Sequence, residues 1–162
     1  MLLIFSSYLS ATPAYAVNKH ELEAVYIYNF TNYITWPKNP KSLTICIYGD
    51  NLVLETLNKI LKKSNKHKSI NIQSPDKASD CHIIFIGGSV ERKIKSVLKE
   101  IQNKSILSIL TVSDSKNFPL NGGMIGLAMN DKQISLEINI KNLENAGLKA
   151  SYKILDMAKI VE

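Results

Sequence analysis

The side chains of this sequence that could carry out chemistry are few and widely spaced. The three histidines, His20, His67 and His82, lack the three- or four-residue spacing that places two metal ligands on one face of a helix. The sequence also contains neither a GxSxG nucleophile motif nor paired carboxylates at an informative spacing. Catalysis is therefore the less favoured hypothesis, and we expect no metal ligands and no bound cofactor.

A few polar residues nevertheless lie where α/β proteins often bind ligands. Asp50 and Asp114 each follow a predicted strand, although an aspartate at such a position is also an ordinary helix cap or turn residue. Gly87-Gly88-Ser89 joins a predicted strand to a helix, and free backbone N–H groups there could bind an anion. Because the GxGxxG and GxxxxGKS/T patterns are missing, we favour a plain turn at this position.

The elements that would position these residues alternate between strands and helices. Continuous apolar runs predict buried strands, and apolar residues at three- and four-residue steps predict helices. The predicted helices lie at 20–36, 52–63, 89–101 and 143–160, and the predicted strands lie at 43–48, 70–72, 81–86, 105–111, 124–129 and 133–140.

This order of elements predicts the fold class. Crossovers from a strand through a helix to the next strand produce parallel pairs, whereas the short turn at Asn130-Asp131-Lys132 must join an antiparallel pair. We predict a single α/β domain with a mixed, mostly parallel sheet that ends in an antiparallel hairpin. Helices are expected on both faces of the sheet.

The charge of the chain does not indicate nucleic-acid binding. The 162 residues include 20 Lys and Arg against 14 Asp and Glu, which gives a formal net charge of +6. Arg92 is the single arginine and the lysines are scattered, whereas nucleic-acid-binding proteins usually rely on clustered arginines. We therefore expect a partner other than nucleic acid.

The N-terminal residues predict export. An apolar run from Leu2 to Ala11 is followed by a small-x-small pattern that ends at Ala16, as in a secretory signal. The run is shorter than the ~20 residues needed to span a bilayer. No Lys or Arg precedes it, so we expect either a start codon further upstream or a weak signal, and a buried N-terminal strand is the alternative. We predict a signal peptide at 1–16, cleaved after Ala16, and one mature domain at 17–162 in the periplasm.

The two cysteines favour a structural role. Cys46 and Cys81 are 35 positions apart, which matches neither a CxxC redox motif nor the spacing of a four-ligand zinc site. In an oxidising compartment, a lone pair is most simply interpreted as one disulfide, and two buried free thiols are the alternative. Without a CxxC motif to lower a thiol pKa, a thiol oxidoreductase is the weakest functional hypothesis.

Several short motifs together indicate a known family. They are Tyr28-Asn29-Phe30, Tyr33, Trp36-Pro37, 43–50, 81–87, 109–114, 122–125, 137–139 and 146–149. In this order and spacing, from about Glu21 to Val161, they resemble the YfiR family of small exported bacterial proteins.

The resemblance implies a non-enzymatic periplasmic regulator, and because its role is inhibition by binding we expect no catalytic residues. The family's namesake binds the periplasmic sensor region of an inner-membrane diguanylate cyclase and lowers cyclic-di-GMP signalling, and redox state and envelope stress relieve this repression. By resemblance, Cys46 and Cys81 are the family's cysteine pair in these two strand motifs. Members can carry a second cysteine pair, but the segment from Ser115 to Asn121 has no cysteine, so redox switching through such a pair is not supported here.

The expected partner is therefore the periplasmic domain of an inner-membrane protein, a diguanylate cyclase by resemblance, and we expect the regulator to be a homodimer. Tyr33, Trp36, Phe118 and Leu120 are candidates for the interface, because interfaces favour aromatic and apolar anchors near the ends of elements. Tyr33 and Trp36 also fit core positions.

The alternative function is a periplasmic receptor for a small ligand. Such a receptor would need a concave site at the strand ends near Asp50, Gly87 and Asp114. In a thermal-shift screen, one class of compound would then raise the melting temperature.

Overall fold

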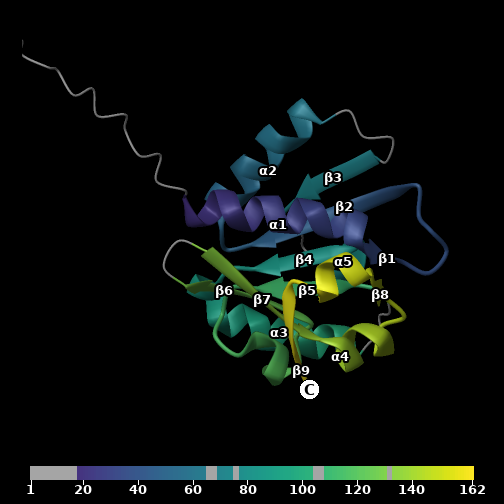
Figure 1. Cartoon of the computed structure of the whole chain (residues 1–162). Helices are drawn as coiled ribbons and strands as arrows, with labels where there is room; N and C mark the ends of the chain where they lie inside the picture. The colour runs from purple at the N-terminus through teal and green to yellow at the C-terminus, as the bar shows by residue number, and fades with distance from the viewer. Residues whose placement is uncertain (1–17, 65–68, 75–76, 104–107, 131–132) are drawn as a thin grey trace, which may run out of the picture.

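A mixed seven-stranded sheet forms the centre of the protein (Figure 1). The computed structural model describes residues 18–64, 69–74, 77–103, 108–130 and 133–162. In spatial order the strands are β3 (Ser69–Gln73), β2 (Ser42–Tyr48), β4 (Ile83–Ile86), β5 (Leu110–Ser113), β6 (Ile125–Asn130), β7 (Gln133–Asn139) and β9 (Ala158–Val161).

The pairing of the strands confirms the predicted sheet. β3, β2, β4, β5 and β6 are parallel, and β7 is antiparallel to β6. The predicted turn residues 131–132 lie outside the described residues. β9 pairs in parallel with β7 at the edge of the sheet. A small antiparallel sheet of β1 (Ile34–Thr35) and β8 (Lys149–Ala150) was not predicted.

Helices cover both faces of the sheet, as predicted. On one face α1 (Lys19–Tyr33) and α2 (Asn51–Lys63) lie side by side (Figure 1). Side chains of α4 (Ile140–Asn145) and α5 (Tyr152–Leu155) belong to the same apolar core. On the other face α3 (Glu91–Asn103) packs with the 3₁₀ helices η1 (Ala78–Asp80) and η3 (Phe118–Asn121), and η2 (Gly88–Val90) leads into α3. None of the helices in the described ranges is long and apolar enough to cross a membrane.

Two apolar cores result, one on each face of the sheet. The larger core packs α1 and α2 against strand residues such as Ile45 and Phe85. The smaller core packs α3 against the opposite face and includes Cys46. Cys46 forms a disulfide with Cys81, and their Cα atoms are 5.8 Å apart. This bond confirms the predicted pairing and ties β2 to the residue that lies shortly before β4.

α1 begins and ends for local reasons that the sequence only partly predicts. The side-chain oxygen of Asn18 accepts a hydrogen bond from the backbone N–H of His20 and caps the helix. The helix ends at Tyr33 rather than at residue 36, because the next two residues pair with β8. Its buried side chains are Glu23, Ala24, Ile27, Phe30 and Thr31.

The C-terminal segment is not the helix predicted for 143–160. α4 ends at Asn145, and Gly147 follows with a φ of +75°, a conformation that glycine adopts without strain. The chain then forms β8, α5 and β9, and β9 pairs with β7. Each of these pieces has no more than six residues, so the apolar spacing over this segment arises from several short elements that all face the core.

Candidate functional site

The order of the strands reverses direction beside β2. From β2 the chain passes through α2 to β3 on one side, and from β3 it returns to β4 on the other side of β2. In open α/β sheets, ligands bind outside the carboxyl ends of the strands at such a reversal. The carboxyl ends of β2, β4 and the adjacent β5 are therefore where a site is expected.

Asp50, Gly87 and Asp114, the positions predicted for a receptor site, lie together at these strand ends. The backbone N–H of Gly88 donates a hydrogen bond to Asp114 Oδ1. A Cβ atom added to Gly87 would lie 3.4 Å from Asp50 Cβ, and one added to Gly88 would lie 3.2 Å from Asp114 Oδ1. The two glycines thus allow the three strand ends to approach closely.

The N-terminal turn of α1 brings further charged side chains to the same place. Lys19 Nζ forms an ion pair with Asp114 Oδ2 and lies 3.4 Å from Glu23 Oε1. His20 Nδ1 lies 3.0 Å from Asp50 Oδ2 and 3.6 Å from Glu23 Oε2. We call Lys19, His20, Glu23, Asp50 and Asp114 the strand-end cluster.

Glu23 is the buried centre of the strand-end cluster. Its side chain is fully buried, and neither carboxylate oxygen has a hydrogen-bond partner. Burial, reinforced by the negative charge of Asp114, raises the pKa of the Glu23 carboxyl to about 7, although the nearby Lys19 opposes this change. Burial would lower the pKa of Lys19, but its hydrogen bond to Asp114 and the charge of Glu23 raise it overall. Lys19 therefore stays positively charged, whereas the negatively charged form of Glu23 is disfavoured.

Sequence reasoning overlooks part of this cluster for identifiable reasons. Comparing His20 only with the other histidines misses Asp50, which lies 30 positions away along the chain. Glu23 shares the helical spacing of Ile27 and Phe30, both fully buried, so its position on the apolar face of α1 was the available signal. The metal-ligand atoms of His20, Glu23 and Asp50 lie within 4.8 Å of one another, which the search for histidine pairs could not reveal.

The four predicted interface residues differ in accessibility. Trp36 is 3% exposed and Phe118 is 1% exposed, so both pack mainly within the core of the chain, and Phe118 also lines the groove described below; their place in an interface stays a prediction. Tyr33 is partly buried, and Lys153 Nζ lies 5.7 Å from the centre of its ring. Leu120 is 54% exposed and is the candidate that a partner reaches most easily.

A groove separates α3 from the segment 115–121 and has a volume of about 710 Å³. Ile94 and Leu98 form part of its apolar floor on the α3 side. Its exposed charged residues are Glu91, Lys95, Lys99 and Lys116, so the lining carries a net positive charge. We call this feature the α3 groove.

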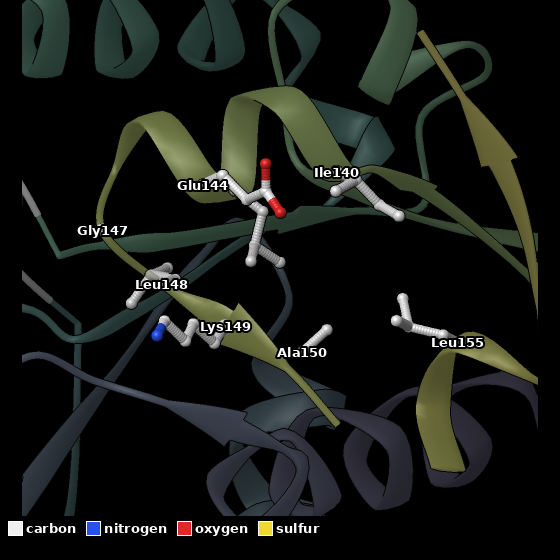
Figure 2. A pocket seen from close by; sticks show the side chains of 8 residues that line it. Ile140, Glu144, Gly147, Leu148, Lys149, Ala150 and Leu155 are labelled. Carbon is white, nitrogen blue, oxygen red and sulfur yellow. The ribbon is translucent and has the colours of Figure 1, made fainter. Parts of the chain in front are cut away.

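The C-terminal elements form a second, mainly apolar pocket (Figure 2). It has a volume of about 470 Å³, and its wall includes Ile140 from α4 and Leu155 from α5. Glu144 and Lys149 add one charge of each sign to the lining. The pocket could not be expected from a single helix over 143–160, because its walls are formed by the separate elements α4, β8 and α5.

Two solved structures share this fold. A conserved domain protein from Vibrio cholerae O1 biovar eltor aligns with a TM-score of 0.55 at 13% identity, covering 89% of this chain and 60% of that chain. The ABC domain from Streptococcus pneumoniae, solved in complex with L-Trp, aligns with a TM-score of 0.55 at 9% identity, covering 84% of this chain and 59% of that one. This chain thus spans about three fifths of each structure, and the likeness concerns the fold alone.

A family model gives the more specific comparison. The model of YfiR/HmsC-like proteins matches residues 20–159, which run from the first turn of α1 into β9. The match confirms the resemblance found in the sequence motifs. Proteins of this kind are periplasmic regulatory domains, and the disulfide of this chain fits an oxidising compartment. The protein therefore belongs to the YfiR/HmsC-like family.

Proposed function

We propose that this protein is a non-enzymatic periplasmic regulator that binds the periplasmic sensor region of an inner-membrane diguanylate cyclase and lowers cyclic-di-GMP output. The observation that carries the proposal is the family match over residues 20–159. The disulfide between Cys46 and Cys81 supports the oxidising compartment that this role requires.

We assign the α3 groove as the surface that meets the partner. Lys95, Lys99 and Lys116 make the groove positive, and the exposed Leu120 follows the lining residue Phe118 by two positions. Protein interfaces commonly combine a few apolar anchors with charges that speed and orient association. The expected occupant is an acidic segment of the partner that also carries an apolar side chain.

Measuring cyclic-di-GMP in cells tests the regulatory role. Deletion of the gene should raise the cyclic-di-GMP level, and the complete gene on a plasmid should restore it. A copy that lacks residues 1–16 should fail to restore it, because the regulator would not reach the periplasm. An unchanged level after deletion, or full rescue by the shortened copy, would contradict repression from the periplasm.

Charge reversal tests the α3 groove. The double variant Lys95→Glu and Lys99→Glu should bind the periplasmic fragment of the cyclase at least ~10-fold more weakly, because two attractive charges become repulsive. Lys59→Glu and Lys63→Glu on α2 form the matched control, since these exposed lysines have the same four-residue spacing. Thermal unfolding should show that both variants are folded. An equal loss of affinity in both would contradict the assignment of the groove.

The receptor alternative is less well supported for an anionic ligand. The backbone N–H of Gly88, which could have bound an anion, already donates to Asp114. Glu23 and Asp50 add further negative charge to the same strand ends. An anion would therefore be repelled, and the ligand that these residues favour is a cation.

A further inference from the structure

We propose that His20, Glu23 and Asp50 bind one divalent transition-metal cation, for which Zn²⁺ is the test ion. The site would join the first turn of α1 to the junction between β2 and α2. This inference goes beyond the regulatory role, because it concerns only the cation affinity of the strand-end cluster.

The spacing of the donor atoms fits a coordination sphere. A tetrahedral ion with bonds of about 2.0–2.1 Å holds its ligand atoms roughly 3.3 Å apart. His20 Nδ1 lies 3.0 Å from Asp50 Oδ2 and 3.6 Å from Glu23 Oε2. All three side chains offer ligand atoms within 4.8 Å of one another. Small side-chain movements would therefore complete a three-ligand site.

The surroundings of Glu23 are an independent sign of a cation site. Its carboxylate is fully buried, yet neither oxygen accepts a hydrogen bond. Oε1 faces Lys19 at 3.4 Å, and Oε2 is directed toward His20. A buried carboxylate is costly unless it is paired or coordinates a metal. Lys19 pairs with Oε1 alone, so a cation between Oε2 and the imidazole would supply a partner for the second oxygen.

The charge balance of the cluster favours a divalent cation. Glu23, Asp50 and Asp114 carry three negative charges when ionised, whereas Lys19 carries one positive charge and His20 can be neutral. The cluster then has a net charge of −2 around its buried centre. One divalent cation bound through the Nδ1 lone pair would neutralise this charge.

The ligands are also held by their own elements. Asp50 Oδ1 accepts a hydrogen bond from the backbone N–H of Val53, so Oδ2 remains directed toward His20. Asn18 caps α1 through the backbone N–H of His20. Such second contacts orient metal ligands and raise affinity.

The chemical types of the ligand atoms, and their exposure to solvent, indicate which metal ions the site would bind. An imidazole nitrogen with two carboxylates suits Zn²⁺, Mn²⁺ or Co²⁺, whereas Mg²⁺ and Ca²⁺ prefer oxygen ligands alone. The side chains of His20 and Asp50 are 29% and 12% exposed, which leaves a path from solvent. That open side would leave room for a water molecule as a further ligand.

Titration of the exported protein, purified without a histidine tag and stripped with a chelator, tests the proposal. Calorimetry with ZnCl₂ should show one ion per chain and a raised melting temperature, and MgCl₂ at the same concentration should produce neither. The Co²⁺-loaded protein should show visible ligand-field absorption that His20→Ala abolishes. Failure of the wild-type protein to bind Zn²⁺, or equal affinity for Mg²⁺, would overturn the proposal.

Variants locate the ion within the molecule. Glu23→Gln, His20→Ala and Asp50→Asn should each lower the Zn²⁺ affinity at least ~10-fold. Asp50→Asn keeps a residue that caps helices well, so α2 should remain intact. Glu137→Gln, which removes a carboxylate paired with Lys159 elsewhere, is the control that should keep wild-type affinity. If the three cluster variants bind Zn²⁺ as tightly as the wild type, the ion lies at another place and the inference is wrong.

Discussion

Replacing Glu23 with glutamine should stabilise the metal-free protein at neutral and alkaline pH. In the unfolded chain this carboxyl ionises at its ordinary pKa of 4.5, whereas burial and the charge of Asp114 raise the pKa to about 7 in the folded protein. Between these two values the unfolded state has lost the proton that the folded state keeps. The free energy of unfolding of the wild type should therefore fall as pH rises from 4.5 through 7, and then level off.

The size of the effect follows from the two pKa values. Raising a carboxyl pKa from 4.5 to about 7 corresponds to a loss of about 3 kcal/mol of stability once the group is ionised in both states. This is an upper value, because water that reaches the cluster beside the 39% exposed Lys19 side chain lowers the cost of burying the Glu23 charge. Glutamine has nearly the same shape without the charge, so the variant should gain little at pH 4 and most at pH 8.

Urea unfolding between pH 4 and 8.5 in the presence of EDTA measures this difference, with the fluorescence of the single tryptophan, Trp36, as the signal. Glu137→Gln is the control, because this carboxylate pairs with Lys159 near the surface. A variant less stable than the wild type at pH 8, or a difference that does not change with pH, would refute the reasoning. Saturating Zn²⁺ should reverse the order of stability, since only the wild type keeps its full ligand set.

Two further predictions concern the fold itself. Replacing both cysteines, Cys46→Ser with Cys81→Ser, should lower the free energy of unfolding by about 4 kcal/mol, because the disulfide closes a loop of about 36 residues in the unfolded chain. An unchanged urea midpoint would contradict this stabilising role. Gly123→Ala should cost about 1–3 kcal/mol, because its new methyl group would lie 2.2 Å from the ring of the buried Phe118. Gly87→Ala places a methyl group at 3.4 Å from its nearest neighbour and should cost clearly less in the same urea experiment.

The sequence predicts the centre of the fold better than its end. The runs at 43–48 and 81–86 are almost entirely apolar, and strands covered on both faces require that pattern. The segment 143–160 instead contains elements of two to four residues after α4, which are too short to show a period of their own. β9 is a strand because β7 offers it an edge, and that reason lies outside its own sequence.

The candidate site was predictable only where backbone topology determines it. The carboxyl ends of parallel strands meet at one edge of a sheet, so the spacing of the elements was enough to bring Asp50, Gly87 and Asp114 together. The contribution of α1 was not predictable in this way. Lys19 and Asp114 are 95 positions apart, and their contact depends on where α1 crosses the sheet.

Asp114 shows why a choice between a ligand-binding role and a turn role was too narrow. Its Oδ1 accepts from the backbone N–H of Gly88 and thereby holds the start of η2, as a turn residue would. Its Oδ2 pairs with Lys19 and thereby helps to set the charge and the pKa of Glu23, as a site residue would. Because the two oxygens act on different elements, one side chain couples the packing of α1 to the geometry of the strand ends. A residue at such a junction is structural and functional at once, and only the folded chain reveals both partners.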